Sequence, residues 1–269
     1  MTNFIDRFRI DRTIYPCQFG AIYAVEDTAS NIMYAAKVIS NFAVKEKSLR
    51  GVEDPFNEVD ILKRIENRPH RNLISSVMVL ATEQSTIAVL PLATADLCEH
   101  PPKTLEEAKL VFHQLLSGLS FLHDIIGVEH GDLSLENVAW FENKSVKIID
   151  YGQAVPIGSV RGYSNVRGKV LYSAPELALG GIVTGACDVF SLGVIMFALV
   201  TGQMPFENAT FRDHWYNALQ VHGLLSSKTG WDHSERLTSE FCELFEGMTK
   251  HDVADRWTLQ RVAAHAWVL

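Results

Sequence analysis

Three polar residues near the middle of the chain carry oxygen atoms of the kind that phosphate chemistry uses. Asp132 and Asn137 lie five residues apart, and Asp150 follows the apolar, β-branched segment 145–149. That segment predicts a short strand that ends at Asp150. Carboxylate and amide oxygens are the ligands that hard cations such as magnesium prefer. The three residues therefore predict a site for magnesium-dependent chemistry on a phosphate group.

Two different sequence patterns must supply the elements that position these residues. The first 90 residues alternate in a way that predicts strands, with one helix among them, whereas helical spacing dominates from Thr104 onward. Thr104 and Glu107 resemble a capping box at the start of the first long helix. The change predicts an α+β fold with a small β-rich lobe and a larger helical lobe. Strands are expected at 8–15, 21–27 and 32–39, and helices at 57–65, from 104 onward, 188–200, 239–248 and 259–265.

Composition excludes several classes of protein. The 269 residues are 47% hydrophobic with a net charge of −8, which permits a large core and argues against nucleic acid as a partner. The four cysteines show no metal or disulfide spacing, so a reducing compartment, the cytoplasm, is expected. No signal peptide or membrane-spanning run is evident. The oligomeric state stays open.

Four motifs occur in the order found in the protein kinase superfamily, which the chain resembles. Residues 130–137 (HGDLSLEN) resemble the catalytic loop H-R-D-L-x-x-x-N, and 150–152 (DYG) resemble D-F-G. Residues 34–37 (YAAK) resemble V-A-I-K, and 173–176 (SAPE) resemble A-P-E. The resemblance covers residues 8–268 and implies a bilobal kinase domain. Its N-lobe is expected at about 8–90, its hinge at about 90–95 and its C-lobe at about 96–268.

The resemblance implies roles for the residues of these motifs. Asp132 would accept the proton of the attacking hydroxyl or orient that hydroxyl. Lys37 would contact the α- and β-phosphates of ATP, held in place by an ion pair with Glu58. Asn137 and Asp150 would hold Mg²⁺.

The resemblance also implies a nucleotide pocket. The carbonyl of Leu90 and the amide of Leu92 would contact adenine, Val89 would guard the rear of the pocket, and Asp96 would contact the ribose. The other nucleotide-contacting positions implied are Ile14, Gly20, Ile22, Ala35, Lys37 and Ala139.

Two departures from the family pattern concern phosphate covering and regulation. In the glycine-rich loop Tyr15 and Cys17 replace glycines and only Gly20 remains, so ATP is expected to be covered less tightly. Gly131 replaces the arginine that in many kinases pairs with a phosphorylated activation loop. Activity is therefore expected not to need phosphorylation between Asp150 and Glu176.

A third departure involves two positions at once. Ser134 replaces the lysine expected two residues after the catalytic aspartate, and Lys169 replaces a threonine in 168–172 (GKVLY), which resembles G-T-x-x-Y. Glu136, where tyrosine kinases can place an arginine, brings no positive charge. One hypothesis is that Lys169 supplies the missing ammonium and Ser134 the missing hydroxyl. The alternative is drift in a weak enzyme.

Two structural markers complete the resemblance. Glu176 and Arg256 correspond to a buried ion pair that anchors the activation segment. Asp188 corresponds to an aspartate that braces the backbone of the catalytic loop. The combined departures are similar to those of lineage-specific kinases of protists.

The function expected is ATP- and Mg²⁺-dependent phosphoryl transfer to serine and threonine hydroxyls of proteins. The competing interpretation is a pseudokinase that binds nucleotide or acts as a scaffold, which the altered loop, Gly131 and Ser134 favour. A small-molecule kinase fits less well, because residues 173–176 match the protein-directed branch.

Overall fold

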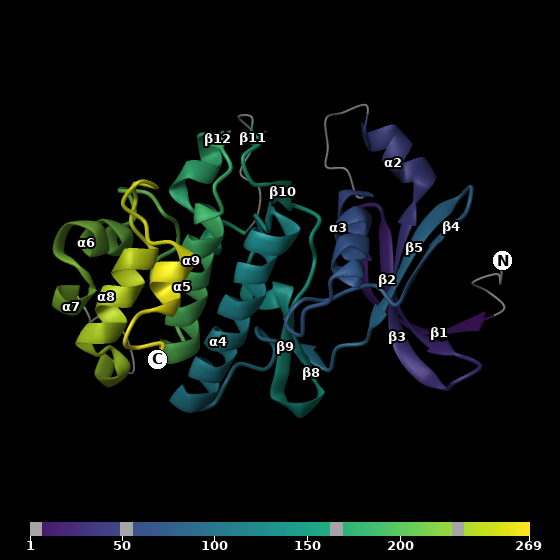
Figure 1. Cartoon of the computed structure of the whole chain (residues 1–269), viewed down its shortest axis with the longest axis horizontal. Helices are drawn as coiled ribbons and strands as arrows, with labels where there is room; N and C mark the ends of the chain where they lie inside the picture. The colour runs from purple at the N-terminus through teal and green to yellow at the C-terminus, as the bar shows by residue number, and fades with distance from the viewer. Residues whose placement is uncertain (1–6, 49–55, 162–168, 228–233) are drawn as a thin grey trace. The chain divides into compact units, whose positions relative to one another are not determined.

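The computed structural model describes residues 7–48, 56–161, 169–227 and 234–269 (Figure 1). Contacts between Cα atoms divide the chain into two compact units. Unit 1 ends at Thr94 and also includes Asp150–Gly152, and unit 2 comprises Ala95–Ile149 and Gln153–Leu269. A β-sheet dominates unit 1 and helices dominate unit 2, so the expected α+β fold class is confirmed.

Unit 1 contains a five-stranded antiparallel sheet with the strand order β1-β2-β3-β5-β4. The sequence predicted β1, β2, β3 and α3 to within about two residues at each end. It did not predict the short strand β4 or helix α2. The elements are β1 (Phe8–Cys17), β2 (Gly20–Asp27), β3 (Ile32–Ser40), α2 (Asn41–Ser48), α3 (Phe56–Asn67), β4 (Met78–Ala81) and β5 (Ser85–Pro91).

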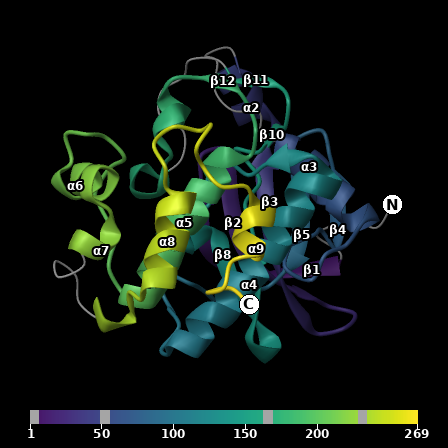
Figure 2. The same ribbon diagram turned by 60° about the vertical axis from the view of Figure 1, so that its left-hand side comes forward.

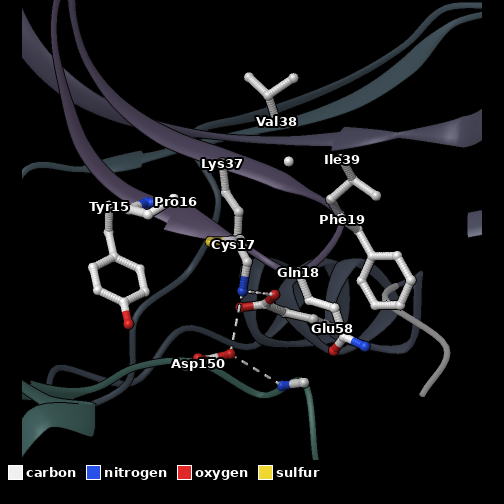
Figure 3. Close-up of a pocket in the computed structure, with 12 residues that line it drawn as sticks. Tyr15, Pro16, Cys17, Gln18, Phe19, Lys37, Val38, Ile39, Glu58 and Asp150 are labelled. Carbon is white, nitrogen blue, oxygen red and sulfur yellow. Dashed lines mark hydrogen bonds and ion pairs between the residues drawn. The ribbon is translucent and has the colours of Figure 1, made fainter. Parts of the chain in front are cut away.

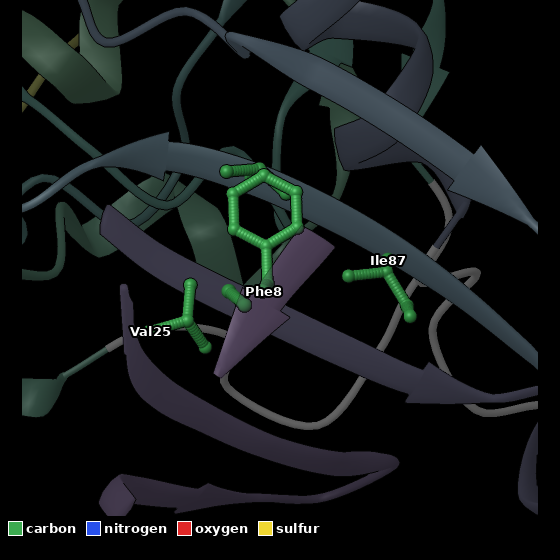
Figure 4. Packing of buried hydrophobic residues seen from close by; sticks show 5 residues of the cluster. Phe8, Val25 and Ile87 are labelled. Carbon is green, nitrogen blue, oxygen red and sulfur yellow. The ribbon is translucent and has the colours of Figure 1, made fainter. Parts of the chain in front are cut away.

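Alternation along β3 gives the sheet two different faces. Ala36 packs on one face with Phe8, Val25 and Ile87. Figure 4 shows the last three of these side chains together. Ile39 lies on the other face, in a cluster to which α2 and α3 contribute Val44 and Val59. Because side chains two residues apart share a face, Lys37 lies on the Ile39 face, the one that α3 covers.

The turn between β1 and β2 depends on one glycine. Cys17 pairs directly with Gly20, so only Gln18 and Phe19 connect the two strands. A Cβ atom at Gly20 would stand 1.9 Å from the carbonyl oxygen of Val38 on β3. The one glycine left in this loop is therefore required by close packing of the sheet, independently of any phosphate.

Unit 2 is built around a helix that is buried along nearly its whole length. This helix, α5 (Ala186–Thr201), is apolar on all sides, as expected of a helix within a core. Figures 1 and 2 both show α8 beside it. The other helices are α4 (Leu105–Phe121), α6 (His214–His222), α7 (Leu224–Ser227), α8 (Ser239–Met248) and α9 (Leu259–Ala263). The bounds of α8 agree with the prediction, α9 ends two residues early, and α6 and α7 were not predicted.

The ends of α4 have distinct local chemistry. Thr104 Oγ1 accepts the Glu107 N–H at 3.2 Å, as a capping box requires, but Glu107 Oε2 accepts the N–H of Lys103 instead of Thr104. At its other end α4 continues into a π-helical turn, Leu122–Ile126, which Gly127 ends with φ 77°. This turn carries His123 into the interior of unit 2.

Short strands connect the remaining loops of unit 2. A three-stranded sheet with the order β6-β8-β9 packs against α4. Two antiparallel pairs, β7 with β10 and β11 with β12, lie elsewhere in the unit. None of the described helices is long and apolar enough to cross a membrane. The strands are β6 (Ala95–Asp96), β7 (Val128–Glu129), β8 (Val138–Phe141), β9 (Ser145–Ile148), β10 (Val155–Pro156), β11 (Val160–Arg161) and β12 (Gly181–Ile182).

Candidate active site

Three charged side chains of unit 1 meet on the α3-covered face of the sheet. Lys37 Nζ donates to Glu58 Oε2 and to Asp150 Oδ1, the latter at 3.2 Å. Figure 3 shows the ammonium directed at both carboxylates. Glu58 is buried on the first turn of α3. The Lys37–Glu58 contact, expected from the sequence, is therefore present.

Burial and mutual charge set the protonation of this group. Burial alone disfavours the charged form of Lys37, but the carboxylates of Glu58 and Asp150 outweigh it and raise the pKa of the lysine above its ordinary value. Burial raises the pKa of Glu58, and the charge of Asp150 adds to that effect, while Lys37 opposes it. The lysine therefore stays an ammonium that can bind a phosphate.

Asp150 has an unusual backbone conformation. It follows β9 and has φ 61°, which is rare for a residue other than glycine and concentrates at functional sites. Its Oδ1 also accepts the Gly152 N–H at 3.4 Å. The next residue, Tyr151, is fully buried and donates its hydroxyl to the Ile74 carbonyl at 3.2 Å. These contacts hold the Asp150 carboxylate at the position where Lys37 meets it.

A pocket of about 330 Å³ opens beside these charges (Figure 3). Among its lining residues, Gly20, Lys37, Glu58 and Asp150 were predicted as site residues. The pocket is also lined by Tyr15 and Cys17 at the end of β1, by Gln18 and Phe19 of the turn and by Gly152. Gln18 and Phe19 were missed, because they lie between the glycine positions of the family pattern, which here are Tyr15, Cys17 and Gly20.

The sheet register places several predicted nucleotide-contacting residues on the face of Lys37. Residues directly opposite one another on neighbouring strands share a face. Ile22 is opposite Lys37, while Ala35 is opposite Leu90. Ile14 lies at a bulge in β1. Leu92, just after β5, is half-buried.

The same register places Leu90, and not Val89, on the face of Lys37. Val89 is opposite Ala36 and fully buried on the other face of the sheet, so its side chain does not lie on the Lys37 face, and Leu90 takes that place. The Val89 carbonyl accepts the Val77 N–H at 2.8 Å. Successive carbonyls along a strand point to opposite sides, so the Leu90 carbonyl points toward β3. This direction counts against its expected contact with adenine.

In unit 2, both carboxylate oxygens of Asp132 are held by donors. Oδ1 accepts the Lys169 N–H at 3.1 Å, and Oδ2 accepts from Asn137 Nδ2 at 3.1 Å. Asn137 Nδ2 also donates to the Asp132 carbonyl at 2.7 Å. The amide group of Asn137 is thus oriented by its nitrogen. Its oxygen accepts no hydrogen bond from the described residues, so it suits a hard cation.

Asp188 braces the backbone that carries Asp132. Its buried carboxylate accepts the N–H of His130 at 2.7 Å and that of Gly131 at 2.9 Å, and His123 Nε2 lies 2.8 Å from it. The role expected for Asp188 is therefore present in the structure. The contribution of His123 was missed, because its position depends on the π-helical turn.

His130 is a packing residue whose tautomer follows from its neighbours. Its Nε2 lies 3.0 Å from the Ile149 carbonyl, which can only accept, so Nε2 carries the proton. Its Nδ1 is then free to accept the Asp132 N–H at 3.2 Å. The fully buried ring thus connects segment 130–137 with the strand that precedes Asp150.

Comparison with known proteins decides the family. The model described as "Protein kinase domain" matches residues 8–268. The chain belongs to the protein kinase family.

Individual kinases match at modest identity. Testis-specific serine/threonine-protein kinase 5 of Mus musculus is 31% identical over 88% of this chain and 63% of that protein. Ribosomal protein S6 kinase alpha-4 of Mus musculus is 30% identical over 84% of this chain and 31% of that protein. CBL-interacting protein kinase 28 of Oryza sativa subsp. japonica is 28% identical over 98% of this chain and 59% of that protein. The chain thus spans 31% to 63% of the length of these relatives.

The ion pair that anchors the kinase's activation segment is present in unit 2. Arg256 donates to both carboxylate oxygens of Glu176, to Oε2 at 2.9 Å. Its fully buried guanidinium also donates to the carbonyls of Ala186 and Lys250, both at 3.0 Å, and lies over the ring of Phe190. Every nitrogen therefore has a partner, which offsets the cost of burying the charge.

Main-chain hydrogen bonds hold the described first part of the activation segment. Val155 pairs with Glu129, and Val160 pairs with Ile182. The Gly158 N–H also donates to the Val183 carbonyl at 2.8 Å. None of these bonds involves a phosphorylatable side chain. Gly168, the first residue of the predicted G-K-x-x-Y motif, lies outside the described residues.

The remaining predicted site residues lie in unit 2. Asp96, on β6, accepts the N–H groups of Cys98 and Glu99, both at 2.8 Å, so it caps the following turn. Ala139 is buried on β8 opposite Asp96. Lys169 Nζ donates to Ser134 Oγ at 2.9 Å. Among the described residues no group of three or more His, Cys, Asp or Glu side chains is arranged to hold a metal ion.

Proposed function

We propose that this kinase is catalytically active and transfers the γ-phosphoryl group of ATP to serine and threonine hydroxyls of proteins. The observation that carries the proposal is the Asp132 carboxylate, both of whose oxygens are held by donors from Lys169 and Asn137. A fixed carboxylate is what orienting a hydroxyl and accepting its proton require. A chain without catalytic function has no need to keep that geometry.

The charged groups of unit 1 serve the nucleotide in this proposal. Lys37, kept protonated by Glu58 and Asp150, contacts the α- and β-phosphates. Asn137 and Asp150 fit Mg²⁺, since one offers an amide oxygen without a partner among the described residues and the other a half-exposed carboxylate. Bound Mg²⁺ would neutralise charge on the phosphates.

The choice of serine and threonine has separate support. The name of testis-specific serine/threonine-protein kinase 5 of Mus musculus gives serine and threonine as the residues that it phosphorylates. Glu136 occupies the position where a tyrosine kinase can carry an arginine. Both observations favour hydroxyl groups of serine and threonine as acceptors in this kinase.

The surroundings proposed for this kinase follow from its composition. The four cysteines are free thiols, which suits the reducing cytoplasm. The net charge of −8 favours protein substrates over nucleic acid.

A second candidate function is a pseudokinase that binds nucleotide without turning it over. The observation in its favour is the end of β1, where Tyr15 and Cys17 line the pocket in place of glycines, just before the tight turn that begins at Gln18. Side chains there hinder close approach of a phosphate to the backbone.

A peptide-library phosphorylation assay separates the two functions. The protein is incubated with radiolabelled ATP and Mg²⁺, with Asp132→Asn as the matched control, which keeps the size of the side chain but removes the base. Activity in the parent protein that is lost in Asp132→Asn supports the enzyme. Equal background in both, together with a nucleotide-induced thermal shift, supports the pseudokinase.

A further inference from the structure

Lys169 contacts three residues of the catalytic loop in unit 2. Its main-chain N–H donates to Asp132 Oδ1 at 3.1 Å. Its side chain returns to the same loop, where Nζ donates to Ser134 Oγ at 2.9 Å and lies 3.2 Å from Glu136 Oε2. One residue thus binds the catalytic aspartate with its backbone and the following residues of the loop with its charge.

The backbone of Lys169 is itself fixed. It precedes the 3₁₀ turn Val170–Tyr172, and its carbonyl accepts the Tyr172 N–H at 2.9 Å and the Ser173 hydroxyl at 3.0 Å. The main-chain N–H and carbonyl of Lys169 therefore both form hydrogen bonds. Because the backbone is fixed, less conformational entropy is lost when the long side chain is held in one position.

The surroundings of the ammonium are half open. Ser134 is fully buried, whereas the side chains of Lys169 and Glu136 are each 39% exposed. An ammonium has three donors. Ser134 accepts one of them, and Glu136 Oε2 lies 3.2 Å away as an ion-pair partner without a hydrogen bond. The remaining donors and the open side leave room for an anionic group.

The chemistry of phosphoryl transfer calls for a cation at this place. As the reaction proceeds, the substrate oxygen forms a bond to the γ-phosphorus and the bond to the β–γ bridging oxygen breaks, with its electron pair leaving on ADP. The proton of the hydroxyl passes to Asp132. Positive groups next to the transferring phosphoryl group stabilise its charge. Between Asp132 and Asn137 the chain contains no lysine or arginine.

We propose that Lys169 supplies this positive charge to the transferring phosphoryl group, and that Ser134 and Glu136 are positioning residues that hold its ammonium. The proposal rests on the proposed kinase activity. In the sequence analysis Glu136 did not supply the missing positive charge. In this proposal it orients the ammonium of Lys169, which does.

A purely structural clamp is the competing explanation of the same contacts. A clamp needs the ion pair between Lys169 and Glu136 but no particular charge at the reacting centre. Removing either partner would then have similar effects. A catalytic cation predicts that loss of Lys169 is far more harmful than loss of Glu136.

The test is a set of variants assayed with a phosphorylated peptide as product. Lys169→Met removes the charge, Lys169→Arg keeps a charge, and Glu136→Gln removes only the ion pair. Lys144→Met is the matched control, because Lys144 forms a similar pair with Glu107, at 3.0 Å, elsewhere in unit 2. For each variant kcat, KM for peptide, ADP affinity and melting temperature are measured.

We expect Lys169→Met to lower kcat by about 10- to 100-fold, the usual range for a lost charged hydrogen bond in a transition state. Affinity for ADP, which lacks the transferred group, and the melting temperature should be nearly unchanged. Lys169→Arg and Glu136→Gln should each lose less than about ten-fold, and Lys144→Met should be unaffected.

An exchange of the two positions gives a second, independent readout. Lys169→Thr alone should behave like Lys169→Met, and the double variant Ser134→Lys with Lys169→Thr should recover most of kcat. If that double variant does not fold, the comparison of Lys169→Met with Glu136→Gln decides.

Two results overturn the inference. A folded Lys169→Met variant with kcat within about two-fold of the parent would show that the charge of Lys169 does not act in catalysis. Equal losses in Lys169→Met and Glu136→Gln indicate the clamp. In both cases the parent enzyme remains active against the Asp132→Asn control, so the proposed function stands. A parent protein without turnover overturns both.

Discussion

The main-chain N–H of Gly131 donates to Oδ1 of the buried Asp188 at 2.9 Å, from a backbone with φ 76°. Glycine adopts this left-handed conformation without strain, whereas the side chain of another residue makes it unfavourable in free energy. The position where most kinases carry an arginine is therefore occupied by the residue that best suits the backbone. Through this contact Asp188 also contributes to the stability of unit 2.

Asp188→Asn should lower the free energy of unfolding by about 3 kcal/mol, since an amide nitrogen would then face the donors of His123, His130 and Gly131. Urea unfolding at pH 7 measures this. Asp124→Asn, at an exposed position of the same unit, serves as the control with an expected change within about 0.5 kcal/mol. Equal effects of the two variants would contradict the assignment.

The contribution of Asp188 should depend on pH in the acid range only. Burial opposes its charge, but the bonds from His123 and Gly131 prevail and lower the pKa of Asp188 below its ordinary value. Because its folded-state pKa is depressed, its stabilising effect is present above the unfolded value of about 4 and is lost as the pH falls through the folded value. Urea unfolding from pH 7 down to pH 3 tests this. A difference between parent and Asp188→Asn that disappears already at pH 5 would be inconsistent with it.

The kinase should not need phosphorylation of its activation segment. Gly131 offers no side chain to bind a phosphate, and main-chain pairing of Val155 and Val160 already holds the described first part of the segment. Turnover after phosphatase treatment should stay within about two-fold of the untreated value. Loss of activity that returns on rephosphorylation would refute this expectation.

The pair of Arg256 with Glu176 should matter for folding more than for chemistry. Arg256→Met leaves the Glu176 carboxylate and three carbonyls without their donor, so we expect a loss of about 3–5 kcal/mol in the free energy of unfolding. The double variant Arg256→Met with Glu176→Leu should be markedly less destabilised than Arg256→Met alone. A double variant that is no more stable would argue against the pair.

Gly20 should be required by the sheet of unit 1. Gly20→Ala places a Cβ atom against the Val38 carbonyl and should cost about 1–3 kcal/mol or more as overpacking. At Gly202 nothing lies within 4 Å and only the backbone conformation, φ 77°, opposes alanine, so Gly202→Ala should cost about 1 kcal/mol. Chemical unfolding of both variants makes the comparison. A smaller loss in the free energy of unfolding at Gly20 than at Gly202 would show that β3 moves to accommodate the added Cβ atom.

The sequence predicted the elements whose side-chain period is strong. The strands β1 to β3 and the helices α3, α5 and α8 follow from local patterns. The pairing of Lys37 with Glu58 was implied by the family resemblance. The side chain of Val89 was expected on the wrong face of the sheet, because the facing of Val89 and Leu90 depends on how β5 pairs with β3. Such pairing is decided by tertiary packing and not by the strand itself.

Other features depend on long-range contacts that no local pattern encodes. The contact of Glu136 with Lys169 joins two residues far apart in sequence. The left-handed conformation of Asp150 is uncommon for a residue other than glycine and is held by its surroundings. The role of His123 requires a π-helical turn, which sequence patterns do not indicate.

The most direct test of the central claim is the rate of phosphoryl transfer to peptides by the parent protein and by Asp132→Asn, with Mg²⁺ and ATP at saturation. An active kinase whose base is Asp132 predicts measurable turnover in the parent and a decrease by about 10²- to 10⁴-fold in the variant. Turnover that is absent from the parent, or equal in the two proteins, would contradict the account.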